Sequence, residues 1–174
     1  SVPTVSVEGR LFTVWLPGVT AAAGTSAGQT YIDTVRHAFD QAHDVCGVVV
    51  DLRGDEGGDM STMLAALAPM LGPGRTVSYQ DRDGYVTTVA RIGNDGSVVV
   101  NDDIVAAPPP IFVPRILPIA ILQGSGTRSA GEAIVMTFRG RKDSRSFGSP
   151  TNGAPTAIDS TRGNFDFAQF DPVP

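Results

Sequence analysis

Cysteine, lysine and histidine are scarce in this sequence of 174 residues. The one cysteine, Cys46, cannot form a disulfide within the chain, so cysteine usage neither favours nor excludes an oxidising compartment, and the localisation stays open. Cys46 and His43 together supply two ligands, and two ligands do not make a zinc site. The sequence therefore predicts no metal centre.

Long apolar runs and clusters of positive charge are also missing. No run approaches the roughly 18 apolar residues that a membrane-spanning helix needs, so no membrane span is expected. The formal net charge is −5 and no Lys/Arg stripe forms, which argues against nucleic acid as a partner. The chain starts at Ser1 with neither an initiator Met nor a signal peptide, so we expect a cut or processed end.

Glycine and proline, in contrast, are plentiful, with 20 and 13 residues. Apolar residues make up 41% of the chain and charged residues 18%, against a usual charged fraction of about 25%. This composition is typical of a loop-rich globular protein. The length is about one domain's worth, so a single domain over residues 1–174 is expected.

The first part of the chain alternates predicted strands and helices. Residue type and apolar spacing predict strands at 2–7 and 10–16, a loop at 19–29, a helix over 30–44, a buried strand over 47–53, and an amphipathic helix from Met60 to Leu71 that Pro69 kinks or ends early.

The later part returns to the same alternation after an antiparallel stretch. The pattern predicts a small antiparallel hairpin insertion over 76–105 with turns at Asp83-Gly84 and Asp95-Gly96, a stiff segment at 107–110, a strand over 118–123, a loop over 124–128 and a helix over 129–139. From Ser146 onward the sequence is turn-rich and polar, and it predicts no element. Repeated strand-loop-helix units indicate an α/β fold.

Two loops follow apolar strands and lead into helices, which is where open α/β sheets place their sites. The first loop, 54–59, contains Gly57-Gly58, where missing side chains let backbone N–H groups approach a ligand. The second ends at Ser129, where a helix N-terminus favours negative charge developing on an attacked carbonyl. Together the loops suggest a serine nucleophile that faces an oxyanion hole.

Each feature also has a purely structural interpretation. Ser129-Ala-Gly-Glu132 is a capping box, a common device in which the serine caps the third amide and the glutamate reaches back. Gly57-Gly58 is compatible with a plain turn. The segment GSGTRS at 124–129 lacks the third glycine of a dinucleotide loop and the first glycine of a GxSxG elbow. From spacing alone, cap and nucleophile both stay open for Ser129.

Four segments, taken in order, resemble peptidase family S41, which includes C-terminal processing proteases, tricorn-type core proteases and interphotoreceptor retinoid-binding-protein modules. RLFTVWLPG at 10–18 resembles the opening strand of the protease domain, and VVVDLRGDEGG at 48–58 resembles the family's VVDLRGNxGG segment. PIAILQGSGTRSAGE at 118–132 resembles the nucleophile segment, and RSFGSPTNG at 145–153 resembles the tfGepTaG segment after it. The tail, residues 157–174, matches nothing in this pattern.

The resemblance implies a crotonase/ClpP-like core and hydrolysis of peptide bonds in a peptide or protein substrate, with no cofactor. It implies Ser129 as the nucleophile and the N–H groups of Ala130 and of Gly57 or Gly58 as oxyanion donors. Glu132 is expected to support the serine.

Asp51 and Arg53 are expected to hold the glycine loop through a buried ion pair, because buried charges need partners. Arg128, beside the serine, either meets a substrate carboxylate or faces solvent.

The general base is the part of the site that the sequence does not show. One branch of the family uses a lysine, but Ala154 stands at its place. Lys142 lies thirteen residues after Ser129, about 20 Å along a helix, whereas proton transfer needs about 3 Å. The other branch uses a histidine before the core and a glutamate after the nucleophile, and His37 and His43 do not match that histidine motif.

Three explanations compete: a fragment or processed piece of a longer peptidase, an inactive relative, or a base supplied by a partner chain in an oligomer. We favour the fragment. The alternative function is a noncatalytic ligand-binding or structural module, which predicts an apolar pocket and an unreactive Ser129. A third hypothesis is a crotonase-type acyl-CoA enzyme, which would have the same fold and the same oxyanion hole but would not need the serine.

Overall fold

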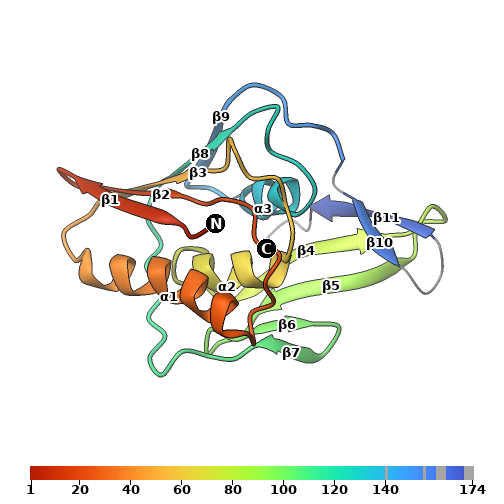
Figure 1. Cartoon of the computed structure of the whole chain (residues 1–174), viewed down its shortest axis with the longest axis horizontal. Helices are drawn as coiled ribbons and strands as arrows, with labels where there is room; N and C mark the ends of the chain where they lie inside the picture. Colours follow the sequence, from red (N-terminus) through yellow and green to blue (C-terminus); the bar gives the residue numbers. More distant parts are fainter. Residues whose placement is uncertain (140, 155, 160–163, 171–174) are drawn as a thin grey trace.

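Two β-sheets and the helices between them form the part of the chain that can be described (Figure 1). The structure is a computed structural model and describes residues 1–139, 141–154, 156–159 and 164–170, the last two ranges by their backbone only. Mixed sheets packed with helices make this an α/β fold, as the alternation in the sequence predicts.

The first sheet carries the parallel strands that lead to the candidate site. Its order is β1-β2-β3-β8-β9, with β1 at Thr4–Glu8, β2 at Leu11–Trp15, β3 at Gly47–Asp51, β8 at Ile119–Gln123 and β9 at Ser144–Gly148. β1 and β2 form an antiparallel hairpin, whereas β2, β3, β8 and β9 are parallel neighbours. The four predicted strands are confirmed within two residues at each end, and β9 lies where the sequence predicts no element.

Helix α1, Ser26–Gln41, begins four residues before the predicted start. Thr25 is its N-cap, and the Thr25 hydroxyl oxygen accepts the N–H of Gly28 at 3.1 Å. The predicted loop at 19–29 is therefore wrong after Thr25, because small residues that read as a loop extend a helix once a cap starts it. An edge-to-face contact between Phe12 and Phe39, with ring centroids 5.2 Å apart, packs α1 on the first sheet.

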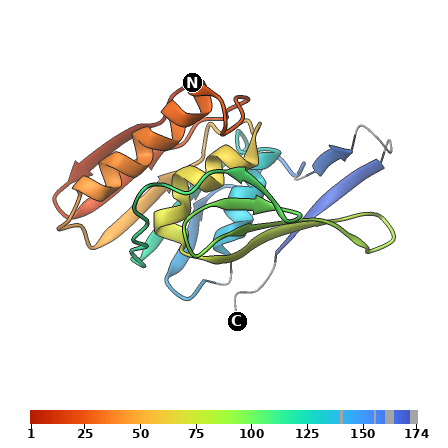
Figure 2. The same cartoon turned by 90° about the horizontal axis from the view of Figure 1, so that it is seen from below.

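Helix α2, Met60–Leu71, is central rather than amphipathic. Every residue from Thr62 to Leu71 is buried, because α1, α3 and the second sheet all pack around it (Figure 2). Pro69 lies inside the helix and does not end it early, since the N–H of Gly72 still reaches the carbonyl of Ala68 at 2.9 Å. A helix that is apolar all round is expected at the centre of a core.

The second sheet is antiparallel and joins two distant parts of the chain. Its order is β10-β11-β4-β5-β6-β7, with β4 at Gly74–Gln80, β5 at Val86–Ile92, β6 at Val98–Val100, β7 at Asp103–Ala106, β10 at Thr156–Asp159 and β11 at Asn164–Phe170. The predicted turns at Asp83-Gly84 and Asp95-Gly96 connect β4 to β5 and β5 to β6. β10 and β11 occupy the tail from which no element is predicted.

The core between the two sheets is continuous. Most of its largest buried side chains come from β2, α1, α2 and α3. Among the described residues, no helix combines the length and the apolar character that crossing a bilayer requires.

Candidate active site

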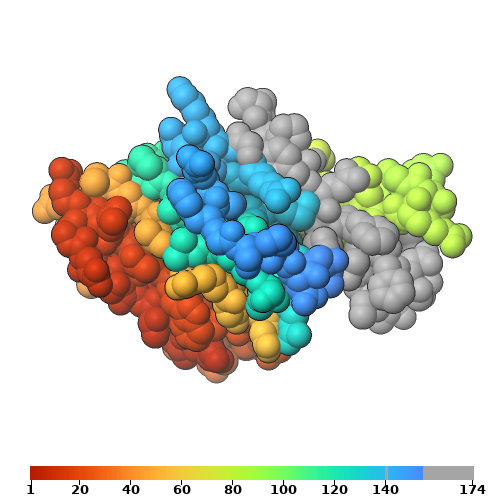
Figure 3. Space-filling model, turned by 90° about the horizontal axis from the view of Figure 1, so that it is seen from above, coloured from red at the N-terminus to blue at the C-terminus, as the bar shows by residue number. Residues whose placement is uncertain are grey.

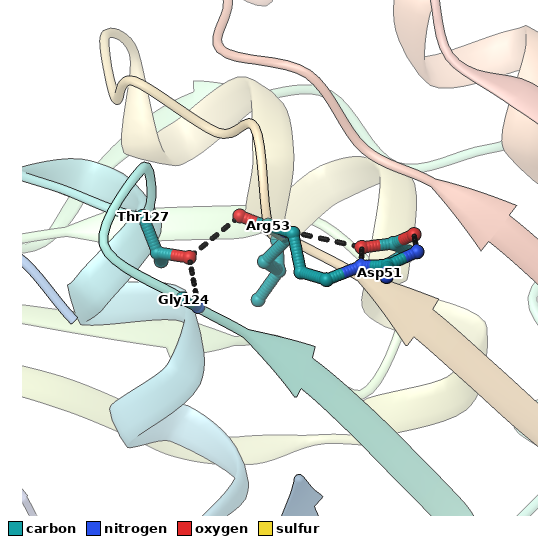
Figure 4. Close-up of polar contacts among 5 residues, drawn as sticks. Asp51, Arg53, Gly124 and Thr127 are labelled. Atoms are coloured by element: carbon teal, nitrogen blue, oxygen red, sulfur yellow. Dashed lines mark hydrogen bonds and ion pairs between the residues drawn. The ribbon is translucent and has the colours of Figure 1, made fainter. Parts of the chain in front are cut away.

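The loops after β3 and β8 meet at the carboxyl edge of the first sheet, and Thr127 joins them (Figure 4). Its hydroxyl donates to the carbonyl oxygen of Leu52 at 2.7 Å and accepts the N–H of Gly124 at 3.1 Å. Thr127 is fully buried. Removing this hydroxyl would leave the buried N–H of Gly124 without its acceptor and would break the link to the Leu52 carbonyl, which also accepts the N–H of Asp55 at 3.0 Å. Thr127 therefore fixes the spacing of the two loops.

Further backbone contacts bring a third segment to the same place. The N–H of Arg128 donates to the carbonyl oxygen of Asp55 at 3.0 Å, and the N–H of Asn152 donates to the carbonyl oxygen of Thr127 at 2.9 Å. Residues near 55, 125 and 150 lie side by side on one face of the molecule (Figure 3). Three segments of the family pattern therefore converge.

Ser129 occupies a strained turn at the start of helix α3, Ala130–Phe138, which is confirmed close to its predicted bounds. Its φ of 53° and ψ of −123° lie outside the extended region that an N-cap usually adopts. Such a backbone costs a non-glycine residue about 1–3 kcal/mol and clusters at functional sites. Ser129 is half-buried, and it is not an ordinary cap by its backbone geometry.

Glu132 holds this turn against the loop at 153–154. The side chain is 4% exposed. Its carboxylate accepts the N–H groups of Gly153 at 2.7 Å, Ala154 at 2.8 Å and Ser129 at 3.2 Å. A buried carboxylate needs such donors, and a helix N-terminus favours its negative charge. Glu132 thus stabilises the strained turn by reaching back to the Ser129 amide.

The glycine turn lies directly against Ser129. Gly57 has φ of 90°, and a Cβ built on it would come 2.7 Å from the Cβ of Ser129 and 3.0 Å from the nitrogen of Ala130. Gly58 has φ of 122°, and a Cβ there would overlap the Val19 carbonyl oxygen. Glycine at both positions allows the main chain itself to approach the serine.

The two glycine amides differ in their partners. The N–H of Gly57 donates to Oδ1 of Asp55 at 2.8 Å, so it is already engaged. Gly58 and Val19 form an isolated parallel β-bridge. Its two hydrogen bonds run from the Val19 N–H to the Gly57 carbonyl and from the Asp59 N–H to the Val19 carbonyl, so the N–H of Gly58 takes no part in it. Among the described residues, the N–H groups of Gly58 and Ala130 donate to no acceptor. Gly58 and Ala130 therefore offer the unengaged donors beside Ser129.

A pocket of about 420 Å³ opens beside the glycine turn. Its lining includes Trp15 from β2 and both glycines. Arg128 and Glu56 also line it and form an ion pair at 2.9 Å, with both side chains largely in solvent. The pocket thus lies next to the serine turn, from which Arg128 contributes to its lining.

A sequence model of peptidase family S41 matches residues 23–165. The chain belongs to peptidase family S41. In this S41 chain, the four motif segments lie within or beside the matched range, and three of them meet at Ser129.

Relatives of this S41 chain include the nisin-resistance protein of Lactococcus lactis subsp. lactis, which is 28% identical over 159 residues, 89% of this chain and 47% of that protein. A lipoprotein from Streptococcus agalactiae has a similar structure, with a TM-score of 0.73 and 20% identity over 97% of this chain and 57% of that chain. The photosystem II D1 C-terminal processing protease follows with a TM-score of 0.57 and 19% identity, covering 92% and 38%. The chain thus spans about half the length of the relatives it matches.

The side chains weighed as general bases lie away from Ser129. Lys142 precedes β9 and lines a pocket with Cys46 at the amino ends of the parallel strands, whereas Ser129 follows their carboxyl ends. A five-residue strand separates these edges by about 17 Å. His37 lines a pocket between α1 and residues 107–113, and His43 follows α1. Within the described ranges, no three of His, Cys, Asp and Glu gather as metal ligands.

Asp51 and Arg53 form the expected pair, but not a buried one (Figure 4). The Arg53 Nη2 lies 2.6 Å from Oδ2 of Asp51, and its Nε lies 2.9 Å from Oδ1. The Arg53 side chain is 62% exposed, because the chain leaves the sheet at this point. Hydrogen bonds from Arg53 lower the pKa of Asp51. The Asp51 carboxylate also accepts the Arg53 N–H, which shapes the first residue of the loop.

Asp55 is a residue of the site that the sequence does not single out. It is fully buried beneath the glycine turn, and burial raises its pKa from 3.8 to about 7 even though the Gly57 N–H donates to it. An acidic residue in a glycine-rich loop gives no sign in the sequence that it is buried. Only the packing of α3 over the loop reveals it.

Proposed function

We propose that this S41 family member is a serine peptidase in which Ser129 is the nucleophile and the N–H groups of Gly58 and Ala130 form the oxyanion hole. The observation that carries the proposal is the approach of the glycine turn to Ser129, close enough that a Cβ on Gly57 would lie 2.7 Å from the serine Cβ. In this proposal, the two unengaged amides stabilise the oxyanion that forms when the Ser129 hydroxyl attacks a carbonyl, which is the arrangement that acyl transfer needs.

In the proposed reaction, the Ser129 Oγ adds to the carbonyl carbon of a peptide bond while its proton passes to a base. The carbonyl π electrons move to oxygen, and the Gly58 and Ala130 amides stabilise the oxyanion. Collapse of this intermediate breaks the C–N bond, and the amine leaves with the proton. Water then cleaves the Ser129 ester by the same two steps.

The strained backbone of Ser129 supports the same assignment. A φ of 53° presents the residue at a tight turn, and the Glu132 carboxylate stabilises that turn through the Ser129 amide. The cap interpretation of Ser129 does not require this conformation, because ordinary caps are extended. Preorganised donors are worth most in such a site: loss of one typically lowers kcat by about 10²–10³.

We propose that the general base reaches Ser129 from outside the described residues, on another segment of a longer chain or on a partner chain. Two observations support this: Lys142 lies at the opposite edge of the sheet, and the chain spans about half the length of its relatives.

We also propose that the fold is crotonase/ClpP-like, with β4–β7 as an antiparallel insertion. The support is the pair of units β3-loop-α2 and β8-loop-α3, whose strands are parallel neighbours. For the substrate we propose peptides or proteins. Since one relative is named for resistance to nisin, nisin is the first substrate to test.

The test is labelling with a serine-directed phosphonate, read by intact mass on the full-length protein. We expect one adduct on the wild type, none on Ser129→Ala, and an unchanged adduct on Ser125→Ala, which alters an exposed serine of the same loop. Cleavage of nisin and of a random peptide mixture, lost in Ser129→Ala, then tests peptidase activity.

The alternatives predict other results. A noncatalytic module on this fold predicts no adduct on the full-length protein, and that outcome removes the peptidase proposal. An acyl-CoA enzyme predicts thioester turnover that survives Ser129→Ala.

A further inference from the structure

The buried carboxyl of Asp55 touches both turns of the site, although the proposed reaction does not use it. Its Oδ1 accepts the Gly57 N–H at 2.8 Å, and its backbone carbonyl accepts the Arg128 N–H at 3.0 Å. The residue is 0% exposed, and Oδ2 has no partner among the described residues. A buried carboxyl with one oxygen unsatisfied is expensive, so its retention calls for a role.

The first turn of helix α3 packs closely against this carboxyl. A Cβ built on Gly131, in the first turn of α3, would lie 2.9 Å from both Cγ and Oδ1 of Asp55. The carboxyl therefore lies between Gly131, which follows Ala130, and the N–H of Gly57, which precedes Gly58. Each of these two residues is thus adjacent in sequence to a proposed oxyanion donor.

No cation is paired with Asp55 in the part of the chain that the structure describes. From α1, Tyr31 faces it, and burial together with the Asp55 charge raises the pKa of that phenol. From the serine loop, the Arg128 side chain pairs instead with Glu56 in solvent. From α3, Glu132 is engaged with backbone amides. An ionised Asp55 is thus uncompensated.

We infer that Asp55 is a positioning residue for the proposed oxyanion hole: it anchors the Gly57 amide, so that the Gly58 amide is the one left for substrate, and its ionisation opposes the oxyanion. This inference rests on the proposed function. A negative charge buried beside the turns that carry the oxyanion donors destabilises a developing oxyanion, and burial limits the screening. The neutral carboxyl keeps the anchor without that repulsion.

Near neutral pH both forms of Asp55 are populated, because its pKa is about 7. The reactivity of Ser129 is therefore expected to fall, relative to a neutral isostere, as pH rises through this range. Asn is that isostere, because its side chain has the size of Asp and keeps a carbonyl oxygen while carrying no charge. In Asp55→Asn, Oδ1 still accepts the Gly57 N–H.

The experiment measures the second-order rate constant of Ser129 phosphonylation on the full-length protein from pH 5 to 9. The ratio of Asp55→Asn to wild type is expected to be near one at pH 5.5 and about tenfold at pH 8.5. Taking the ratio removes the titration of the base, which both proteins share. The control is Asp59→Asn, which changes another acid of the same loop to an equally good N-cap and should give a flat ratio.

The outcomes separate the two proposals. Labelling with a flat ratio for Asp55→Asn overturns the inference and leaves the nucleophile intact, whereas no labelling of any variant overturns the proposed function.

A second measurement uses the wild type alone, so it tests the inference even if Asp55→Asn fails to fold. The ¹³C carboxyl signal of Asp55 should titrate about one pH unit higher when a boronic acid forms its anionic adduct on Ser129. An unchanged midpoint overturns the inference.

Discussion

Ser129 and Asp55 are two residues of the candidate site whose conformation or environment departs from ordinary chain behaviour. Ser129 has a left-handed backbone, and Asp55 is an acid with an unsatisfied buried oxygen. Asp55 accepts the backbone N–H groups of Gly57 and Arg128, and the N–H of Ser129 donates to the Glu132 carboxylate. Local strain of this kind persists only where the surroundings over-determine it, which is the usual situation at a reactive site.

Asp55 also predicts how stability depends on pH. In the folded protein, the Asp55 carboxyl keeps its proton up to about pH 7, whereas in the unfolded chain it loses the proton near pH 3.8. The free energy of unfolding therefore falls as the pH rises from about 3.8 to about 7, and it levels off above pH 7. The loss is about 4 kcal/mol. In Asp55→Asn this slope should vanish and stability at pH 8 should rise, as measured by urea unfolding at pH 4.5, 6 and 8.

Asp51 contributes the opposite slope, because its lowered pKa adds stability at higher pH. The difference between Asp55→Asn and wild type at each pH is therefore the quantity to compare. Asp59→Asn should parallel the wild type. If Asp55→Asn also parallels it, the buried acid does not titrate as described.

At the scale of elements, the site depends on a turn whose glycines are not equivalent. Gly58 has φ of 122° and no room for a Cβ beside the Val19 carbonyl, whereas Gly54 has no positive φ and its nearest neighbour would be Trp15 Nε1 at 3.7 Å. The same loop thus holds one glycine that the geometry requires and one that it tolerates.

Gly58→Ala is therefore expected to destabilise the protein by about 3 kcal/mol or more and to abolish phosphonate labelling. Gly54→Ala should change stability by less than about 1 kcal/mol and keep the label. Urea unfolding and intact mass on the two variants check this. Equal behaviour of the two would show that the turn is not built as the structure describes.

The elements that sequence patterns predict well are those whose signal is local. The buried strands β3 and β8 and the helices α2 and α3 show apolar runs or helical spacing, and they lie close to their predicted bounds. β10 and β11 are not predicted, because β11 pairs with β4, which is far away in the chain. The alternation of Phe165 and Phe167 with polar neighbours is a local strand signal, but it is short and lies in a turn-rich, polar tail.

At the scale of the whole molecule, helices α2 and α3 link the two sheets into one core. Helix α2 packs against α1, α3 and strands β5–β7 of the second sheet, and every residue from Thr62 to Leu71 is buried. Helix α3 contacts β8 and β9 of the first sheet and β4 of the second. The two sheets therefore share one apolar core, and we expect them to unfold together.

Leu67→Ala, in the middle of α2, is expected to lower the free energy of unfolding by about 2–5 kcal/mol while keeping a single transition. Val7→Ala, at a side chain that is 52% exposed, should change it by less than about 0.5 kcal/mol. Tryptophan fluorescence of Trp15 and far-ultraviolet circular dichroism should report coincident urea transitions. Two separate transitions would contradict a shared core.

The sequence by itself determined the α/β alternation, the family and the candidates Ser129 and Gly57-Gly58, because these rest on apolar periodicity and on short motifs of adjacent residues. Only the tertiary structure decided that Thr127 joins the two loops, that the Gly57 amide is taken by Asp55, and that Arg53 lies in solvent. Those facts depend on which backbone groups meet across the carboxyl edge of the sheet, and a contact between segments about 75 residues apart leaves no mark on either segment alone.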